Sequence, residues 1–174
     1  ARMLQRPGPD EFAPFYQGYI EKVPTGDVLE HLRRQGERTS ALLAAIPEAK
    51  GLFAYAPGKW TVKRLVQHLV DGERLFCYRA MCIARGEQGS LPGFDENAYA
   101  DQDGSDARPL AQIAAEYAAV RAATLTLYAG MTDAVSQRRG TANGKSVSVR
   151  ALLWMTAGHE LHHLTILRER YGIG

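Results

Sequence analysis

The chain has 174 residues, of which 45% are hydrophobic and 23% are charged, so length and composition predict one globular domain with a sizeable core. Lysine and arginine number 21 and aspartate and glutamate 19, and this net charge of +2 does not favour a nucleic-acid-binding protein. The two cysteines fit a reducing compartment, and no run is apolar enough for a membrane span or a signal peptide, so we expect a cytoplasmic protein with neither a nucleic-acid nor a membrane partner.

The first 24 residues combine proline, glycine and aromatic residues, so residues 1–24 are expected to form an N-terminal arm with little regular structure. A single helical domain is expected over residues 25–174. Its first helix is predicted to begin at Thr25 or Asp27, either of which can cap a helix, and to end before Pro47. Positions on one face of this helix recur at alternating steps of four and three and form a partly polar seam, made of Val28, Leu32, Gln35, Thr39, Leu42 and Ile46.

A second helix is predicted from Val62 to about Arg85. Thr61 is a suitable cap because its hydroxyl can accept a first-turn N–H, and Gly86 is a suitable stop. Residues 86–107 contain four glycines, one proline and several acidic residues, so we expect a long crossover loop there. Loops of this length in a compact domain are often functional.

The third helix is predicted to open at Asp106 and Pro109, and it carries the regular apolar stripe that is typical of a helix bundle. The stripe consists of Leu110, Ile113, Tyr117, Val120, Thr124 and Leu127. Residues 130–147 are polar, and the Asn143-Gly144 pair favours a tight turn within a small hairpin.

The fourth helix is predicted to begin after Ser148, which can cap it, and to continue to Tyr171, where Gly172 provides a C-terminal stop. Four helices joined by loops predict an all-α fold, a four-helix bundle with a long crossover loop between the second and third helices. No alternating run of residues predicts a sheet larger than the small hairpin.

The fourth helix carries three of the five histidines. At about 100° per residue, His159 and His163 fall on the same apolar face as Leu152 and Ile166, one turn apart. His162 lies nearer the edge of this face. Two imidazoles one turn apart on a buried face can reach one metal ion.

The second helix carries one histidine, His68, on its apolar face near Leu65. Gly72, one turn further on, leaves room beside this histidine, and Arg79 lies three turns along the same stripe. A buried guanidinium needs an anion, which is either a carboxylate of the protein or a group of the substrate. Arg79 is therefore a predicted substrate-binding residue.

Three inward-facing histidines on two helices predict a metal site made of His68, His159 and His163, because one cation satisfies three imidazole nitrogens together. The alternative is that each histidine is a neutral core residue with a hydrogen bond of its own. Three protein ligands leave one position open for water or substrate, as in catalytic metal sites. The sequence assigns no catalytic residue.

A zinc-protease signature, H-E-x-x-H, is also present at residues 159–163. The extended form of that signature fails, because Ile166 stands where it requires glycine and Glu169 where it requires a third histidine. Glu160 also points away from the face that His159 and His163 share. A protease is therefore disfavoured.

Four motifs occur in order along the chain: Lys59-Trp60-Thr61-Val62 leading into His68, Tyr78-Arg79, Phe94-Asp95-Glu96-Asn97-Ala98-Tyr99, and Gly158-His159-Glu160-Leu161-His162-His163. Together they resemble the DinB/YfiT-like superfamily over about residues 25–171. The resemblance implies a four-helix bundle with a long crossover, often dimeric. It also implies a metal held by one histidine of the second helix and two of the fourth, here His68, His159 and His163.

The resemblance implies a range of activities. Members include S-transferases and isomerases that depend on bacillithiol or mycothiol, metal-dependent hydrolases, and many proteins without a known activity; the family name refers to DNA damage and does not imply DNA binding. We therefore expect a metal-dependent enzyme that transfers a small thiol to an electrophile, with hydrolysis or non-catalytic, stress-linked metal binding as the alternatives. Zinc is the first choice of metal, with nickel and manganese as alternatives. The expected partners are a small-molecule substrate or thiol, with a homodimer as one expected assembly.

The Asp95-Glu96 pair matches a loop segment of the family near the open end of the site. These carboxylates are predicted to bind substrate, as partners of Arg79 or of a water on the metal; the alternative is a solvated loop pair. His162 is expected to bind substrate rather than the metal, and to lie at the rim of the site or directly behind the metal ligands.

Overall fold

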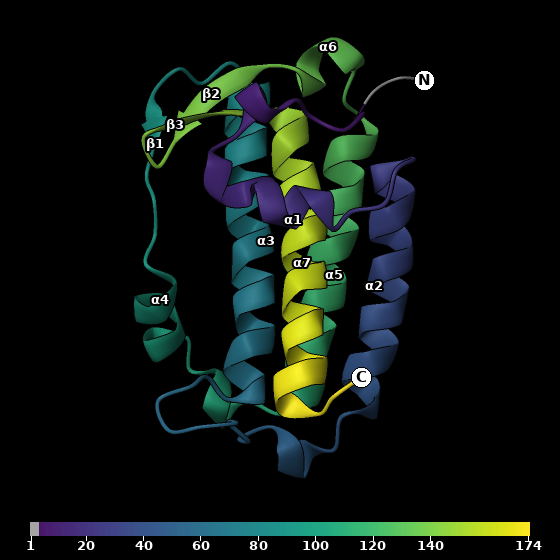
Figure 1. The fold of residues 1–174 in the computed structure, drawn as a ribbon, viewed down its shortest axis with the longest axis vertical. Coiled ribbons are helices and arrows are strands. Elements are labelled where there is room, and N and C mark those ends of the chain that lie inside the picture. The colour runs from purple at the N-terminus through teal and green to yellow at the C-terminus, as the bar shows by residue number, and fades with distance from the viewer. Residues whose placement is uncertain (1–3) are drawn as a thin grey trace.

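The computed structural model describes residues 4–174 and contains the predicted four-helix bundle (Figure 1). Its long helices are α2 (Val28–Ala45), α3 (Val62–Ala84), α5 (Leu110–Ala129) and α7 (Val149–Tyr171). They bury a core of aliphatic and aromatic side chains, and Trp154, Tyr117 and Tyr128 are among its largest fully buried members. The predicted all-α fold is confirmed.

Local side chains begin and end these helices as predicted. Asp27 accepts from the Leu29 amide at the start of α2, and Thr61 and Ser148 each accept from the amide three residues later at the starts of α3 and α7. Gly172 ends α7 in the left-handed conformation, with φ of +69°, which glycine adopts without a steric cost.

The start of α5 is stabilised from a distance rather than by its own sequence. Asp106, predicted to open this helix, instead accepts from the Thr61 hydroxyl at 2.6 Å and pairs with Arg64 at the start of α3. The Leu110 amide donates to Glu48, which belongs to the connection between α2 and α3. Only the folded chain brings these groups together.

The order of the helices around the bundle differs from their order along the chain. α3 packs against α5 and α7, and α2 packs against α5 and, over a smaller area, against α7. Helices that are consecutive in sequence, α2 with α3 and α5 with α7, are therefore diagonal partners. The consecutive helices α3 and α5, by contrast, pack side by side. Figure 1 shows that the crossover returns along the outside of α3 to its starting end, so that α5 runs parallel to α3.

The crossover contains more regular structure than the sequence predicts. The expected loop forms a strand, β1 (Ser90–Leu91), and a helix, α4 (Glu96–Gln102). The predicted long crossover is present between α3 and α5, and these two short elements lie within it. The sequence did not reveal them because a two-residue strand has no detectable alternation, and because α4 is short and capped by Asp95, whose carboxylate accepts from the amides of Asn97 and Ala98.

The predicted hairpin is present as β2 (Arg139–Ala142) and β3 (Lys145–Ser148). Asn143 and Gly144 both have positive φ, as a tight two-residue hairpin turn requires. β1 pairs in parallel with β2, with Ser90 opposite Thr141, and completes a three-stranded sheet at one end of the bundle. A single helical turn, α6 (Asp133–Ser136), precedes the hairpin.

The N-terminal arm is also more ordered than expected. It contains two short 3-10 turns, at Pro9–Glu11 and Pro14–Tyr16, and the helix α1 (Gln17–Glu21), which crosses the face of α7 (Figure 1). The first three residues lie outside the described part of the chain. Within the described residues, no helix combines the length and the apolar character that crossing a membrane requires.

Candidate metal centre

The three histidines predicted to share one site lie together in the structure. His68 of α3 faces His159 of α7, with their Nε2 atoms 2.9 Å apart, and His163 follows one turn later on α7. One nitrogen from each ring belongs to a group whose atoms all lie within 4.8 Å of one another. All three side chains are buried.

Burial keeps these imidazoles neutral. It lowers the pKa of His68 to about 4 and that of His163 to about 3, with smaller effects from neighbouring histidines. The pKa of His159 lies well below its ordinary value, first because of burial and then because of His163 and His68. A neutral imidazole has a free lone pair, so at neutral pH each ring can act as a metal ligand.

The arrangement of polar atoms fits a bound cation. The Nδ1 atom of His163 is buried and has no hydrogen-bond partner within residues 4–174, and the Nε2 atoms of His68 and His159 face each other with one shared proton at most. A divalent transition metal satisfies such nitrogens together, and imidazole suits zinc, nickel and copper. The buried histidines can therefore bind a metal ion.

Aromatic rings and a glycine position the imidazoles. The indole of Trp60 lies 4.8 Å from the ring of His68, and the rings of Tyr19 and Phe76 lie 5.6 and 5.7 Å from that of His159. Gly72 makes room as predicted, but for His159 rather than for His68: a Cβ at residue 72 would lie 3.1 Å from Cε1 of His159.

Of the predicted substrate-binding residues, Glu96 and His162 lie near the three histidines. The Glu96 carboxylate, in the first turn of α4, is exposed and lies 3.7 Å from Nε2 of His68. His162 is half-buried at the rim, where its ring lies 5.0 Å from those of Tyr19 and His163. Burial and the nearby Lys22 lower the pKa of His162.

Asp95 and Arg79 have other surroundings. Asp95 is exposed and caps α4, and so helps to place the adjacent Glu96. Arg79 is buried three helical turns beyond His68, where its guanidinium donates to the Pro92 carbonyl at 2.9 Å and lies 5.8 Å from the ring of Phe94. Neither Asp95 nor Glu96 forms an ion pair with this guanidinium.

A cavity of about 220 Å³ lies beside the three histidines and reaches His163. His163 and Trp60 contribute to its wall, together with Asn97 of α4 and the aromatic rings of Tyr55 and Tyr171. A mostly apolar wall with a few polar groups is typical of a small-molecule site.

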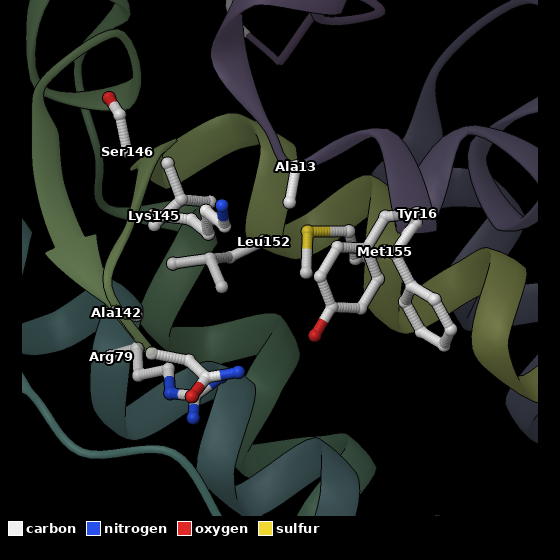
Figure 2. A pocket seen from close by; sticks show the side chains of 11 residues that line it. Ala13, Tyr16, Arg79, Ala142, Lys145, Ser146, Leu152 and Met155 are labelled. Carbon is white, nitrogen blue, oxygen red and sulfur yellow. The ribbon is translucent and has the colours of Figure 1, made fainter.

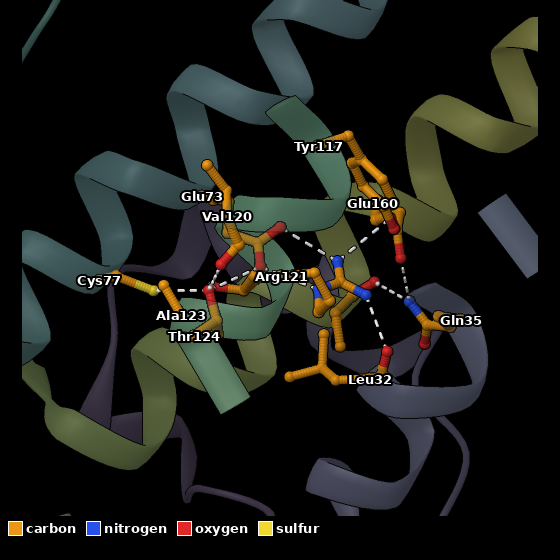
Figure 3. A network of polar contacts seen from close by, with 12 residues as sticks. Leu32, Gln35, Glu73, Cys77, Tyr117, Val120, Arg121, Ala123, Thr124 and Glu160 are labelled. Atoms are coloured by element: carbon orange, nitrogen blue, oxygen red, sulfur yellow. Dashed lines mark hydrogen bonds and ion pairs between the residues drawn. The ribbon is translucent and has the colours of Figure 1, made fainter. Parts of the chain in front are cut away.

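Glu160 points away from the histidines, as predicted, and belongs to a buried polar network (Figure 3). Its carboxylate accepts from the Tyr117 hydroxyl, from Gln35 at 2.8 Å and from Arg121 at 3.1 Å. Arg121 also donates to Glu73, which in turn accepts from Thr124. With its acceptor capacity used in this way, Glu160 has none of the surroundings of a protease base.

Sequence reasoning missed this network. The available signal was Arg121, which lies beside Tyr117 and Thr124 on the predicted apolar stripe of the third helix. A charged residue within a buried stripe requires a buried partner of opposite charge. The pattern does not identify that partner, because Glu73 and Glu160 come from two other helices.

Comparisons with known proteins agree with this architecture. The model of the DinB superfamily matches residues 31–167. None of the curated proteins matches the sequence. The fold is similar to that of YfiT from Bacillus subtilis, described as a probable metal-dependent hydrolase with an unusual four-helix bundle topology, with a TM-score of 0.70 and 18% identity over 98% of this chain and 95% of YfiT.

Two further solved structures share the fold. The mycothiol-dependent maleylpyruvate isomerase has a TM-score of 0.67 and 16% identity over 83% of this chain, which spans 61% of that protein. The DinB-like protein YjoA from Bacillus subtilis has a TM-score of 0.58 and 23% identity over 82% of this chain and 87% of YjoA. The family match covers most of the chain and includes all three buried histidines. This protein therefore belongs to the DinB superfamily.

Proposed function

We propose that this protein is a divalent-metal-dependent enzyme that transfers a small thiol to an electrophilic substrate. The observation that carries this proposal is the convergence of three buried, neutral imidazoles beside an accessible cavity. Within residues 4–174 no carboxylate or cysteine belongs to that group of ligand atoms. The ligand set therefore leaves the charge of a bound dication uncompensated, which favours an anionic sulfur ligand from outside the chain.

The metal would be held by His68, His159 and His163, with zinc as the first choice and nickel and manganese as alternatives. A divalent cation there would lower the pKa of a thiol or of a water molecule that reaches it. The protein's own contribution is to keep the three rings neutral by burial and fixed by the packing of Trp60 and Phe76.

The thiol is supplied from outside. Partial burial raises the pKa of the Cys77 thiol to about 11, and this half-buried thiol is 3.2 Å from the Thr124 hydroxyl. A thiol that stays protonated at neutral pH is a poor nucleophile. A low-molecular-weight thiol is therefore the expected cosubstrate, and the similarity of the fold to that of a mycothiol-dependent isomerase supports this choice.

Glu96 is the candidate general base. Its exposed carboxylate, 3.7 Å from Nε2 of His68, would accept the thiol proton before sulfur attacks the electrophile. Asp95 is a positioning residue because it caps the helix on which Glu96 lies. His162 and Tyr19, at the rim, would contact the substrate.

Hydrolysis is the second candidate function. The same Glu96 carboxylate would take a proton from water, and the similarity of the fold to that of YfiT favours this alternative. Non-catalytic metal binding is the third, and it requires only the histidines.

The first test is elemental analysis of the purified chain. We expect about one equivalent of a transition metal per chain, lost in His68→Ala and retained in the matched control His162→Ala. Equal metal content in His68→Ala and in the wild type would overturn the ligand assignment. Absence of metal from the wild type after incubation with zinc, nickel and manganese would remove the enzyme hypothesis.

The second test separates the three functions. The metal-loaded protein is assayed with a set of low-molecular-weight thiols and a test electrophile, and separately with an activated ester without thiol. Rates that need both metal and thiol support transfer, and thiol-independent ester cleavage supports hydrolysis. If neither assay gives a rate, non-catalytic metal binding is the function that remains.

Glu96→Gln is expected to lower the rate of whichever reaction is observed by about 10²-fold or more, at unchanged metal content. Asp101→Asn, at the far end of α4, should leave that rate unchanged.

A further inference from the structure

A second cavity, of about 310 Å³, lies between the N-terminal arm, the β2–β3 hairpin and the first turns of α7 (Figure 2). Tyr16 of the arm, Leu152 and Met155 of α7 and Val147 of the hairpin supply apolar walls. None of the histidines lines this cavity. Its volume is at the lower end of the range for small-molecule sites.

Arg79 lies at the wall of this cavity, across it from Tyr16 and Met155 in Figure 2. Its side chain is 4% exposed, yet within residues 4–174 no carboxylate lies within 4.0 Å of its guanidinium. Its one acceptor in that part of the chain is the Pro92 carbonyl. A guanidinium has five N–H groups in a planar fork, so most of its donors remain for a ligand.

A second deeply buried arginine, Arg121, shows how a guanidinium with a structural role is paired in this protein. Arg121, equally buried, is paired with Glu73 and Glu160 and donates to the Leu32 carbonyl. A buried charge is costly unless it is paired. The contrast indicates that the partner of Arg79 comes from outside the chain.

The rest of the lining has the charge of an anion site. Lys145 of β3 adds a second positive charge and forms no ion pair within the described residues, and no acidic residue lines the cavity. Ser146 and Asn143 of the hairpin add neutral polar groups. The two positive side chains, Arg79 and Lys145, together with the apolar walls, fit a molecule that has an anionic group and an apolar body.

We propose that this cavity is a binding site for a small organic carboxylate with an aromatic or branched apolar body. The Arg79 fork binds the carboxylate, which matches it in planar, two-pronged geometry, and Lys145 adds attraction at the mouth. The apolar body packs on Leu152, Met155 and the Tyr16 ring.

This site is separate from the metal centre. The Phe76 ring stands between them, with its centroid 6.3 Å from that of Tyr16 and 5.7 Å from that of His159. The inference goes beyond the proposed function and does not require it, because the cavity contains none of the metal-binding histidines. Binding is therefore measured on metal-free protein.

The experiment is a calorimetric titration of the full metal-free chain with 4-phenylbutyrate. Its neutral analogue 4-phenylbutanamide lacks the charge, and acetate lacks the apolar body. We expect saturable binding of one 4-phenylbutyrate per chain, and at least tenfold weaker binding of both comparison compounds. Equal binding of acid and amide, or no saturable binding of the acid, would overturn the proposal.

Variants locate the bound molecule. Arg79→Gln is expected to remove the preference for acid over amide, and retention of that preference in a folded variant would overturn the assignment. If Arg79→Gln does not fold, the test uses Lys145→Gln on the hairpin surface. We expect this variant to bind 4-phenylbutyrate about threefold more weakly than the wild type does. Lys50→Gln, at the opposite end of the bundle, is the matched control and should bind as the wild type does. Equal affinity in Lys145→Gln and Lys50→Gln would contradict the site.

Discussion

Two glycines determine how closely the chain surrounds His159. Gly72 on α3 leaves the space that the imidazole fills, since a Cβ there would lie 3.1 Å from Cε1. Gly158, the residue before His159, lies against the backbone of α1, where a Cβ would overlap the Tyr19 carbonyl. This close crossing brings the Tyr19 ring to 5.6 Å from that of His159. A side chain at either position would displace a wall of the metal centre.

The close crossing predicts the effect of one added methyl group. Gly158→Ala should lower the free energy of unfolding by about 1–3 kcal/mol, because α1 must move away from α7. Gly18→Ala is the matched control: it lies on α1 with open space around it and should raise the free energy of unfolding by up to about 1 kcal/mol. Urea denaturation measures both. A Gly158→Ala protein as stable as the wild type would contradict the backbone contact.

At the scale of elements, the N-terminal arm is fastened to the start of α7. The Glu11 carboxylate accepts from Arg150, from the Ser148 hydroxyl and from the Gly8 amide. Burial by itself would raise the pKa of Glu11, but these hydrogen bonds outweigh it and lower the pKa to about 2. The Trp154 indole adds a 2.8 Å hydrogen bond to the Leu4 carbonyl. This attachment also holds the arm over the carboxylate-binding cavity.

The lowered pKa of Glu11 predicts a pH dependence of stability. The carboxylate stabilises the fold at pH values above its unfolded pKa of about 4.5, and this contribution is lost as the pH falls toward 2. Glu11→Gln should therefore lower the free energy of unfolding by on the order of 2 kcal/mol at pH 7. The difference from the wild type should shrink below pH 4.5. Denaturation curves at pH 7 and pH 3 measure it, and a difference that grew on acidification would show that Glu11 is not held as a carboxylate.

At the scale of the whole molecule, each of the four long helices contributes at least one polar side chain to a common buried network. Gln35 comes from α2, Glu73 from α3, Arg121 from α5 and Glu160 from α7 (Figure 3). Arg121 is the one positive charge between two buried carboxylates in this network, and the nearby carboxylates raise its pKa against the effect of burial. A directional network of this kind favours one arrangement of four otherwise similar amphipathic helices.

Arg121→Met tests this central role. Removal of the guanidinium leaves two buried carboxylates without a counter-charge, so we expect a loss of about 3–5 kcal/mol in the free energy of unfolding. The control is Arg33→Met on α2, where the ion pairs with Glu30 and Glu37 are exposed and the expected loss is at most about 1 kcal/mol. If Arg121→Met does not fold, Tyr117→Phe should cost about 1–3 kcal/mol, because it removes one hydrogen bond to Glu160. Equal losses in Arg121→Met and Arg33→Met would contradict the network's role.

Local sequence was sufficient to predict the four long helices and most of their ends. Asp27, Thr61 and Ser148 act on amides two or three residues away, so their capping is visible without the fold. The helical period alone puts His159 and His163 on one face. It also predicted an inward His68, and the structure brings these three rings together.

Contacts between segments that lie far apart in the sequence follow from how the folded chain packs. The diagonal order of the helices, the pairing of β1 with β2, and the capping of α5 by Glu48 all join residues far apart in sequence. The period of a helix was enough to predict that His68, His159 and His163 face inward, because it places each of them on an apolar stripe. Which inward charges meet depends on packing: Arg121 meets Glu73 and Glu160, whereas Arg79 meets a cavity.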